Sequence, residues 1–420
     1  MTRFLHASDL HLDSPLRGLD RYDGAPVERL RTATRAALER LVDKALAERV
    51  DFVLLVGDIY DRDWQDFHTG LFFREQMVRL GREDIPVFIV QGNHDAQGVI
   101  TRQLPLPPNV TVFSSRTAQT FRIDGLSVAI HGRSFPARAV DEDLVPSYPE
   151  PVPGCFNIGM LHTSLTGRPG HDTYAPTDLA ALVAKGYDYW ALGHVHAREV
   201  VSEQPRIVFP GNLQGRHANE TGAKGCELVK VDAGRVEAEF IALDMVRWSQ
   251  VPVPLDGIDR LEALAEAFRK ALEPVLLGAT DRLHAVRVTL TGSTGLQQIE
   301  ANQPGTLTAA VQAAAQDITE AEVWIEQVRL ALSTPLDRAR AAQRQDAVGE
   351  LLRLVDAIAG DDAELGAWAQ KELGDLVGAM PPEVAAGDVP RLDHPADLRA
   401  LLLDAEATVL ARLAAAGEGA

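Results

Sequence analysis

Short apolar runs alternate with longer amphipathic stretches over about the first 240 residues. Uninterrupted apolar runs predict buried strands, and they lie at 51–56, 86–90, 128–131, 156–161 and 187–192. Apolar residues recur at helical spacing through 27–49, and a second helix is predicted over 67–80. This alternation predicts an α/β domain whose strands are largely buried.

The pattern changes near Trp248. An extended segment at 251–255, strands at 283–290 and 323–332, and helices at 258–276 and 306–318 predict a small α+β domain. Beyond residue 335 the pattern is helical only, with helices expected at 337–359, 363–377 and 395–415. We therefore predict three domains, at 1–245, 246–334 and 335–420.

Composition and charge restrict the class of protein. The chain has 420 residues, 46% hydrophobic and 24% charged, as in ordinary globular proteins. It lacks the apolar run of about 20 residues that a membrane helix needs, and its two cysteines lack paired spacing, so we expect a cytoplasmic protein with reduced thiols and no membrane contact. The net charge of −19, with most of the acidic excess after residue 240, argues against a broad basic grip on nucleic acid.

Five polar motifs follow the predicted strands of the first domain. Their candidate metal ligands are Asp9, His11, Asp58, Asn93, His162, His194 and His196. Taken singly, most of these motifs more often serve a turn or a packed core, although Gly193-His194-Val195-His196 is moderately specific. Together, in order and at strand ends, they predict a metal site, because α/β sheets bind ligands at the carboxyl ends of their strands. Carboxylate, imidazole and amide donors suit Mn²⁺, Zn²⁺ or Fe²⁺, and the absence of thiolates argues against structural zinc.

The series resembles the calcineurin-like metallophosphoesterases. This resemblance implies a four-layer αββα sandwich with two mixed sheets, followed here by a small α+β cap and a helical segment. It also implies two divalent cations, one held by Asp9, His11, Asp58 and His196, the other by Asp58, Asn93, His162 and His194. A hydroxide shared by the two cations would then attack a phosphodiester in line.

The resemblance also gives His94 a role. It implies that this imidazole contacts the phosphate and protonates or stabilises the leaving oxygen. A neighbouring carboxylate would orient the ring, with Asp61 as the first candidate and Asp95 as the second. A solvated loop acid is the alternative interpretation of Asp61.

Within this family, four stretches resemble the SbcD-type DNA repair nuclease subunits of the YhaO-like branch, at 6–13, 57–61, 186–196 and 209–217. The resemblance implies a DNA exo/endonuclease that uses Mn²⁺, or Fe²⁺, Zn²⁺ or Mg²⁺. It also implies a homodimer that works with an SMC-like ATPase of SbcC type or YhaN-like, bound through the C-terminal helices. One departure is Asp61, which stands where many archaeal and eukaryotic relatives have histidine.

Several further residues are candidates for contact with substrate or partner. Arg216 and His217 could face the substrate, although a solvated surface position is the alternative for each. The other arginines near motif ends are Arg133, Arg168 and Arg198. Large apolar side chains at 64–73 indicate core packing or a dimer face, for which Trp64 and Phe67 are the better candidates.

Three functions stay open. The first is the DNA nuclease with its ATPase. The second is a small-molecule or cyclic-nucleotide phosphodiesterase that uses the same metals. The third is a scaffold without activity, against which the intact ligand set and His94 argue.

Overall fold

A computed structural model describes residues 1–14, 24–61, 67–96, 105–167, 173–336, 338–379 and 394–417 of the chain. The chain divides into two compact units. The first unit is Met1–Ser249 with Asp281–Ala285, and the second unit is Gln250–Thr280 with Val286–Ala420.

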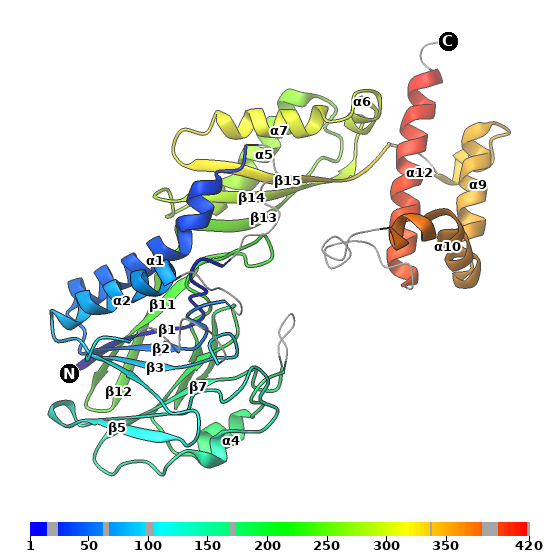
Figure 1. The fold of residues 1–420 in the computed structure, drawn as a ribbon. Helices are drawn as coiled ribbons and strands as arrows, with labels where there is room; N and C mark the ends of the chain where they lie inside the picture. The colour runs from blue at the N-terminus through cyan, green and yellow to red at the C-terminus, as the bar shows by residue number, and fades with distance from the viewer. Residues whose placement is uncertain are drawn as a thin grey trace. The chain divides into compact units, whose positions relative to one another are not determined.

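Two six-stranded sheets form the first unit (Figure 1). One has the order β12-β11-β1-β2-β3-β4, and its strands are β1 Thr2–Ala7, β2 Phe52–Val56, β3 Val87–Val90, β4 Val110–Val112, β11 Gly225–Asp232 and β12 Arg235–Ala242. The other has the order β5-β6-β7-β8-β10-β9, and its strands are β5 Gln119–Ile123, β6 Val128–Gly132, β7 Phe156–His162, β8 Tyr189–Gly193, β9 Glu199–Glu203 and β10 Arg206–Phe209. Both sheets are mixed, since β1 pairs with β2 in parallel but with β11 in antiparallel fashion, and β10 does the same with β8 and β9.

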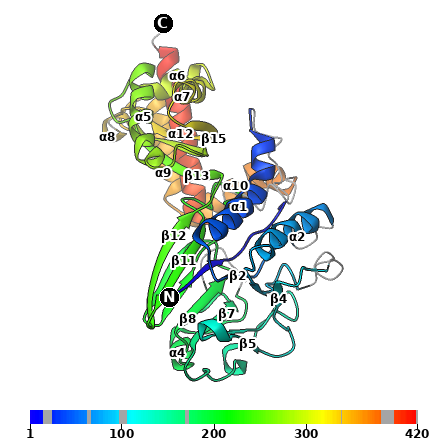
Figure 2. The ribbon, with the colours of Figure 1, turned by 90° about the vertical axis from the view of Figure 1, so that its left-hand side faces the viewer.

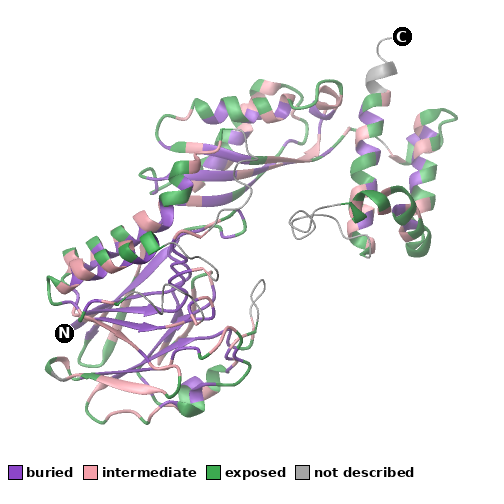
Figure 3. Ribbon diagram, in the orientation of Figure 1, coloured by how far each residue is buried: buried purple, intermediate pink, exposed green. Residues whose placement is uncertain are grey.

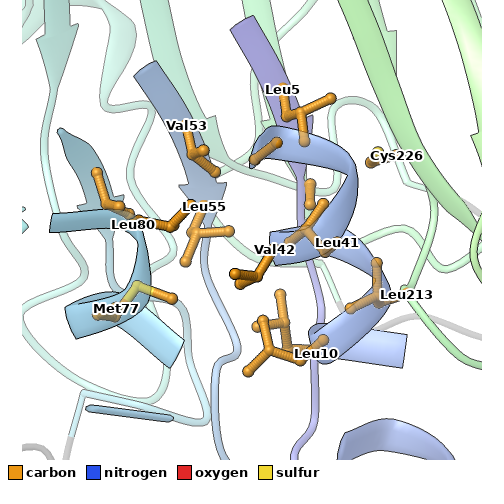
Figure 4. Close-up of a cluster of buried hydrophobic side chains, with 14 of the residues drawn as sticks. Leu5, Leu10, Leu41, Val42, Val53, Leu55, Met77, Leu80, Leu213 and Cys226 are labelled. Carbon is orange, nitrogen blue, oxygen red and sulfur yellow. The ribbon is translucent and has the colours of Figure 1, made fainter. Parts of the chain in front are cut away.

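Strand alternation explains how the first sheet is covered on both faces. Leu5, Val53 and Leu55 point toward the helices α1 (Val27–Glu48) and α2 (Phe67–Gly81), which lie side by side over this sheet (Figures 1, 2 and 4). Phe4 and Phe52, on the alternate positions, join a second core with residues of the other sheet. Figure 3 shows the outcome, with the central strands buried and the outer sides of the helices exposed.

The outer face of the second sheet has its own apolar layer. Trp190 and Leu192 of β8 pack there with Leu182 of the helix α4 (Leu179–Ala184) and with Phe135 and Leu144 from the connecting loops. The first unit therefore has helix, sheet, sheet, and a layer of loops with a short helix. The predicted fold class, mixed α/β sheets with helices, is confirmed.

An α+β segment follows in the chain, most of it in the second unit. A three-stranded sheet of β13 (Val246–Pro254), β14 (Leu283–Ser293) and β15 (Glu322–Ser333) packs one face against α5 (Leu261–Leu276) and α7 (Thr306–Gln316). The short helix α6 (Leu296–Asn302), which the sequence did not predict, closes the same core through Leu296.

The helical segment follows, with α8 (Arg338–Ala341), α9 (Ala347–Ala359), α10 (Asp362–Gly378) and α12 (Pro395–Gly417). The single helix predicted over 337–359 was wrong, because the chain leaves the helix after Ala341 and starts again at Ala347. There the Asp346 side chain accepts a hydrogen bond from the Gly349 N–H and caps the new helix. Asp337 lies outside the described residues.

The helix α2 presents a mixed surface. Phe73 is buried, whereas Phe67 and Leu71 are 43% and 50% exposed. Trp64 lies outside the described residues, so the dimer face at this helix stays a prediction. Among the described helices, none has the length and apolar character needed to cross a membrane.

Candidate metal centre

All five polar motifs lie at carboxyl ends of central parallel strands. Asp9 and His11 follow β1, Asp58 follows β2, and Asn93 follows β3 in the first sheet. His162 ends β7, and His194 and His196 follow β8 in the second sheet. Because the two sheets stack, their strand ends meet at one edge of the sandwich. There the His194 N–H donates to the Asp9 Oδ2, across 185 positions of the chain.

The backbone adopts a rare conformation at four of these positions. Asp9, His11, Asp58 and His194 have φ values of 53°, 44°, 51° and 99°. Such left-handed conformations cost of order 1–3 kcal/mol at residues with a side chain, so the surrounding structure must impose them. It does so through cross-strand hydrogen bonds: the Asp9 N–H donates to Gly57 O and the His11 N–H to Asp58 O.

Glycines make the close approach of the side chains feasible. A Cβ atom at Gly57 would lie 2.2 Å from the His162 Nδ1, and one at Gly92 would lie 2.3 Å from the Asp58 Oδ1. Any side chain at these positions would displace His162 or Asp58. The Gly-Asp and Gly-Asn-His motifs therefore keep glycine for steric reasons.

The first donor set, defined as Asp9, His11, Asp58 and His196, converges on one point. The Nε2 atoms of His11 and His196 lie 3.2 Å apart. The His196 Nε2 lies 3.7 Å from the Asp9 Oδ1, and the His11 Nε2 lies 3.9 Å from the Asp58 Oδ2. Ligand atoms of Asp9, His11 and His196 all lie within 4.8 Å of one another, close enough for one cation, and the Asp58 carboxylate borders this group through His11.

The second donor set, defined as Asp58, Asn93, His162 and His194, lies beside it. The His162 Nε2 lies 3.0 Å from the Asn93 Oδ1 and 3.6 Å from the Asp58 Oδ2. The ring of His194 stands 5.2 Å from that of His162, centroid to centroid. The Asp58 carboxylate faces both sets, as a bridging ligand must.

Several observations show that cations fit here. The Asp9 Oδ1 is buried and has no hydrogen-bond partner among the described residues. Two imidazole nitrogens face each other across 3.2 Å, where uncompensated lone pairs would repel. Burial lowers the pKa of His11, reinforced by the charge of Arg216, so the imidazole is neutral and able to act as a ligand. Burial opposes ionisation of Asp58, yet the histidines His162, His94 and His11 around it lower its pKa to about 2.

Two carboxylates stand behind the first donor set. The Asp61 Oδ1 lies 2.7 Å from the His11 Nδ1, and the Glu220 Oε1 lies 2.7 Å from the His196 Nδ1. Burial opposes ionisation of both acids, but the histidine hydrogen bonds and the charge of Arg216 hold the pKa of each well below its usual range. Each carboxylate therefore accepts from an Nδ1–H, which leaves the Nε2 lone pair directed at the cation position.

Sequence reasoning did not find Glu220. No motif surrounds it, and its partner His196 lies 24 residues earlier in the chain. The available signal was its spacing of four residues from Arg216, already a candidate, since the two side chains pair at 3.0 Å.

His94 lies at the open side of the site. Its backbone N–H donates to the Asp58 Oδ1 at 2.9 Å, and its Nδ1 lies 3.2 Å from the Asp61 Oδ1. The side chain is 21% exposed, compared with 1% for His11. Asp61 thus lies beside His94 as expected, although it is closer to His11.

Asp95 has a different position from the one expected. Its carboxylate accepts hydrogen bonds from the backbone N–H groups of Ile59, Tyr60 and Gly92. These bonds tie the loop after β2 to the loop after β3. Asp95 therefore fixes the backbone that carries Asp58 and Asn93, rather than the imidazole of His94.

The candidate substrate residues differ in burial and in their ion pairs. Arg216 is largely buried, with its guanidinium between Asp61 and Glu220, whereas His217 is 58% exposed. Arg133 pairs with Glu142 at 3.5 Å and Arg198 with the buried Glu227 at 2.6 Å. Arg168 lies outside the described residues.

The chain is similar to known phosphoesterases. The calcineurin-like phosphoesterase family model matches residues 2–198, and the model of the metallophosphoesterase YhaO middle domain matches residues 248–334. The chain is 36% identical to the uncharacterized metallophosphoesterase YhaO of Bacillus subtilis (strain 168) over 338 residues, which cover 78% of this chain and 80% of that protein.

Two solved structures also align with part of the chain. A dimetal phosphatase from Danio rerio is 12% identical, covering 58% of this chain and 96% of that one, with a TM-score of 0.35. The protein TT1561 of Thermus thermophilus is 14% identical, covering 57% of this chain and 98% of that one, with a TM-score of 0.32.

Proposed function

The chain belongs to the calcineurin-like metallophosphoesterase family, and on that premise we propose that it is a dinuclear metal-dependent phosphodiesterase that cleaves DNA. The observation that carries the dinuclear part is the position of Asp58, whose carboxylate faces both donor sets. Of the metals that this donor chemistry admits, Mn²⁺ is our choice.

The roles of the donor sets follow from their contacts. The first donor set would hold one cation and the second donor set the other. Two cations bound there would acidify a water and neutralise the charge that develops on a phosphodiester. Asp9 and Asp58 supply fixed negative charge for this, and Asp61 and Glu220 hold two of the imidazoles in the tautomer that leaves Nε2 available.

His94 is the residue that we propose for proton transfer. Its greater exposure lets the imidazole reach the leaving oxygen of a bound phosphodiester, while Asp61 and the Asp58 carboxylate orient and charge-stabilise the ring. A protonated His94 would donate its proton to that oxygen as the P–O bond breaks.

DNA as the substrate and an SMC-like ATPase as the partner rest on the resemblance of the motif stretches to SbcD-type nuclease subunits and on the order of the domains. The helical segment supports an ATPase partner, because its helices expose large apolar side chains. These are Leu354 on α9, Leu376 on α10, and Leu403 and Val409 on α12. We propose this segment as the surface that binds the ATPase, and a homodimer as the working form.

One observation favours the alternative, a small-molecule or cyclic-nucleotide phosphodiesterase. Arg133, Arg198 and Arg216 each pair with an acidic side chain of this chain, and the net charge is −19. A long DNA contact needs basic side chains directed at phosphates. A small phosphodiester needs only the metal centre and His94.

The decisive experiment compares two substrates with three proteins. Wild type, Asp58→Asn and His94→Asn are incubated with Mn²⁺ and either end-labelled linear DNA or bis-p-nitrophenyl phosphate. We expect Asp58→Asn to lose at least about 100-fold in rate on both substrates. His94→Asn should lose more on DNA than on the nitrophenyl ester, because nitrophenolate leaves without a proton.

The outcomes separate the proposals. Wild-type hydrolysis of the small ester without cleavage of DNA would favour the alternative. Cleavage at the wild-type rate by Asp58→Asn would overturn the metal centre itself. For the partner, the full chain and a Leu403→Glu variant are tested for co-elution with a purified SMC-like ATPase, and only the wild-type chain should be retained.

A further inference from the structure

Arg216 joins the two carboxylates behind the first donor set. Its Nη1 lies 3.6 Å from the Asp61 Oδ1 and its Nη2 lies 3.0 Å from the Glu220 Oε1. The backbone N–H of Arg216 also donates to the Glu220 Oε2 at 2.7 Å. A chain of contacts therefore runs from the His11 imidazole through Asp61, Arg216 and Glu220 to the His196 imidazole.

The tautomers in this chain follow from the acceptors. An ionised carboxylate can only accept, so both Nδ1 atoms carry hydrogen and both Nε2 atoms carry lone pairs. The Arg216 Nη2 also lies 3.3 Å from the His196 Nδ1. Both of those atoms then carry hydrogen, so this contact is not a hydrogen bond, and the 2.7 Å bond to Glu220 decides the tautomer.

Glu220 is itself fixed by the fold. Its Oε2 accepts from the Asn212 Nδ2 at 2.9 Å, and Asn212 pairs with Ser8, next to Asp9, across the sheets. The Lys224 Nζ donates to the His196 carbonyl at 2.7 Å. The loop after β10 thus holds His196 at both its side chain and its backbone.

In the second donor set, His162 has an acceptor of a different kind. The Nδ1 of His162 lies 3.1 Å from the Val56 carbonyl oxygen, a neutral backbone acceptor. A charged acceptor raises the basicity of the imidazole more than a neutral one does. The two histidines of the first donor set have the carboxylates of Asp61 and Glu220 as acceptors. The positive charge of Arg216 offsets the negative charge of these two carboxylates.

We infer that Arg216 and Glu220 are positioning residues that set the affinity of the first donor set for its cation and leave that of the second donor set unchanged. This inference rests on the proposed dinuclear centre. It also changes the expected role of Arg216, since a guanidinium held between two carboxylates supports the ligands instead of gripping the substrate.

Glu220→Gln and Arg216→Gln test the inference. Each metal-free protein is titrated with Mn²⁺ by isothermal titration calorimetry, and the bound metal is counted by mass spectrometry after dialysis. Wild type should bind two equivalents. Each variant should keep one equivalent at wild-type affinity and lose about 10- to 100-fold in affinity for the other. The matched control is Glu237→Gln, which breaks an exposed Arg–Glu pair on β12 and should bind as wild type does.

Several outcomes would overturn the inference. Unchanged affinities in both variants would show that the acids do not support the ligands; a raised KM in Arg216→Gln at unchanged affinity would return Arg216 to substrate binding. Equal weakening of both equivalents would indicate a general disturbance of the fold, which near-ultraviolet circular dichroism would report. Failure of the wild type to bind any divalent cation would instead contradict the proposed function.

Discussion

At the scale of single residues, the polar interior of the first unit is as informative as its ligands. His6, on β1 between the two sheets, is fully buried. Its Nε2–H donates to the Leu192 carbonyl and its Nδ1 accepts from the Tyr189 hydroxyl, both at 3.0 Å. Burial lowers the pKa of His6 to about 3, so the imidazole is neutral in the folded protein.

The pH dependence of stability follows from this shift. The ordinary pKa of histidine is about 6.5, so below that pH the unfolded chain binds a proton that the folded chain refuses. His6 therefore contributes stability that is present above about pH 6.5 and is lost as the pH falls toward 3.

The unfolding free energy of the wild type should fall between pH 7 and pH 5. We predict that this fall is about 2 kcal/mol smaller in His6→Gln, which has no imidazole to protonate. Urea denaturation of the metal-free proteins at both pH values measures it. Identical losses in the two proteins would show that His6 is protonated in the folded state or that its site admits water. A change to Gln at His68, which is exposed on α2, serves as the control.

The candidate ligands were predicted from sequence, and the structure shows why their convergence was predictable. Asp9, Asp58 and His162 each sit at a strand end, and strand ends can be recognised from the apolar runs before them. The acids behind the histidines could not be assigned in this way. Asp61 approaches His11 across 50 residues, and Glu220 approaches His196 only because the loop after β10 returns to the site. Such contacts depend on tertiary structure, so no local pattern assigns either acid to its histidine.

At the scale of elements, one carboxylate anchors the loop that carries the first two ligands. Asp13 follows His11 and accepts hydrogen bonds from Arg35 of α1, at 2.8 and 3.0 Å from the Arg35 Nε, and from Thr69 of α2. Its backbone N–H donates to the Thr34 Oγ1 at 3.1 Å. The loop is thereby fixed to both helices that cover the first sheet.

We predict that Asp13→Asn lowers the unfolding free energy by about 1–3 kcal/mol, because Arg35 loses its charged acceptor in a partly buried position. The affinity for Mn²⁺ should fall as well, since the anchor is two residues from His11. Denaturant titration and calorimetry measure the two effects. Asp43→Asn, which removes a more exposed partner of Arg79, is the control and should change stability by less than about 1 kcal/mol. A loss no larger than the control's would contradict the anchoring role.

Elements were predicted unevenly. The buried strands β2, β3, β7 and β8 were predicted because both their faces are covered and their sequences are uninterrupted apolar runs. The edge strands β9 and β12 were not, because one side faces solvent and their residues are mixed. The break between α8 and α9 was missed because the stretch up to Asp346 contains helix-forming residues, and the capping bond shows only in three dimensions.

At the scale of the whole molecule, every candidate ligand belongs to the first unit. Cations at this centre would connect the two sheets, since β1, β2 and β3 supply ligands from one and β7 and β8 from the other. Anything that binds only the folded state stabilises it, by about 2.7 kcal/mol when its concentration is about 100 times the dissociation constant.

We predict that saturating Mn²⁺ raises the melting temperature of the first unit by about 5–10 °C and leaves the transition of the second unit in place. Differential scanning calorimetry with Mn²⁺ and with a chelator measures the shift. In Asp58→Asn, Mn²⁺ should raise the melting temperature of the first unit by much less. An equal shift of both transitions, or of neither, would contradict the location of the cations.

Glu220 and β11 follow all seven candidate ligands in the chain, and this order has a consequence for biosynthesis. The first sheet is incomplete until β11 pairs with β1, and His196 lacks its acceptor until residue 220 has been made. A nascent chain that has passed β8 and His196 already contains all seven candidate ligands, yet its centre cannot assume the described geometry. If the centre binds metal as we propose, we expect loading to follow the synthesis of β11, and a chain that stalls earlier to be a metal-free intermediate exposed to chaperones and proteases.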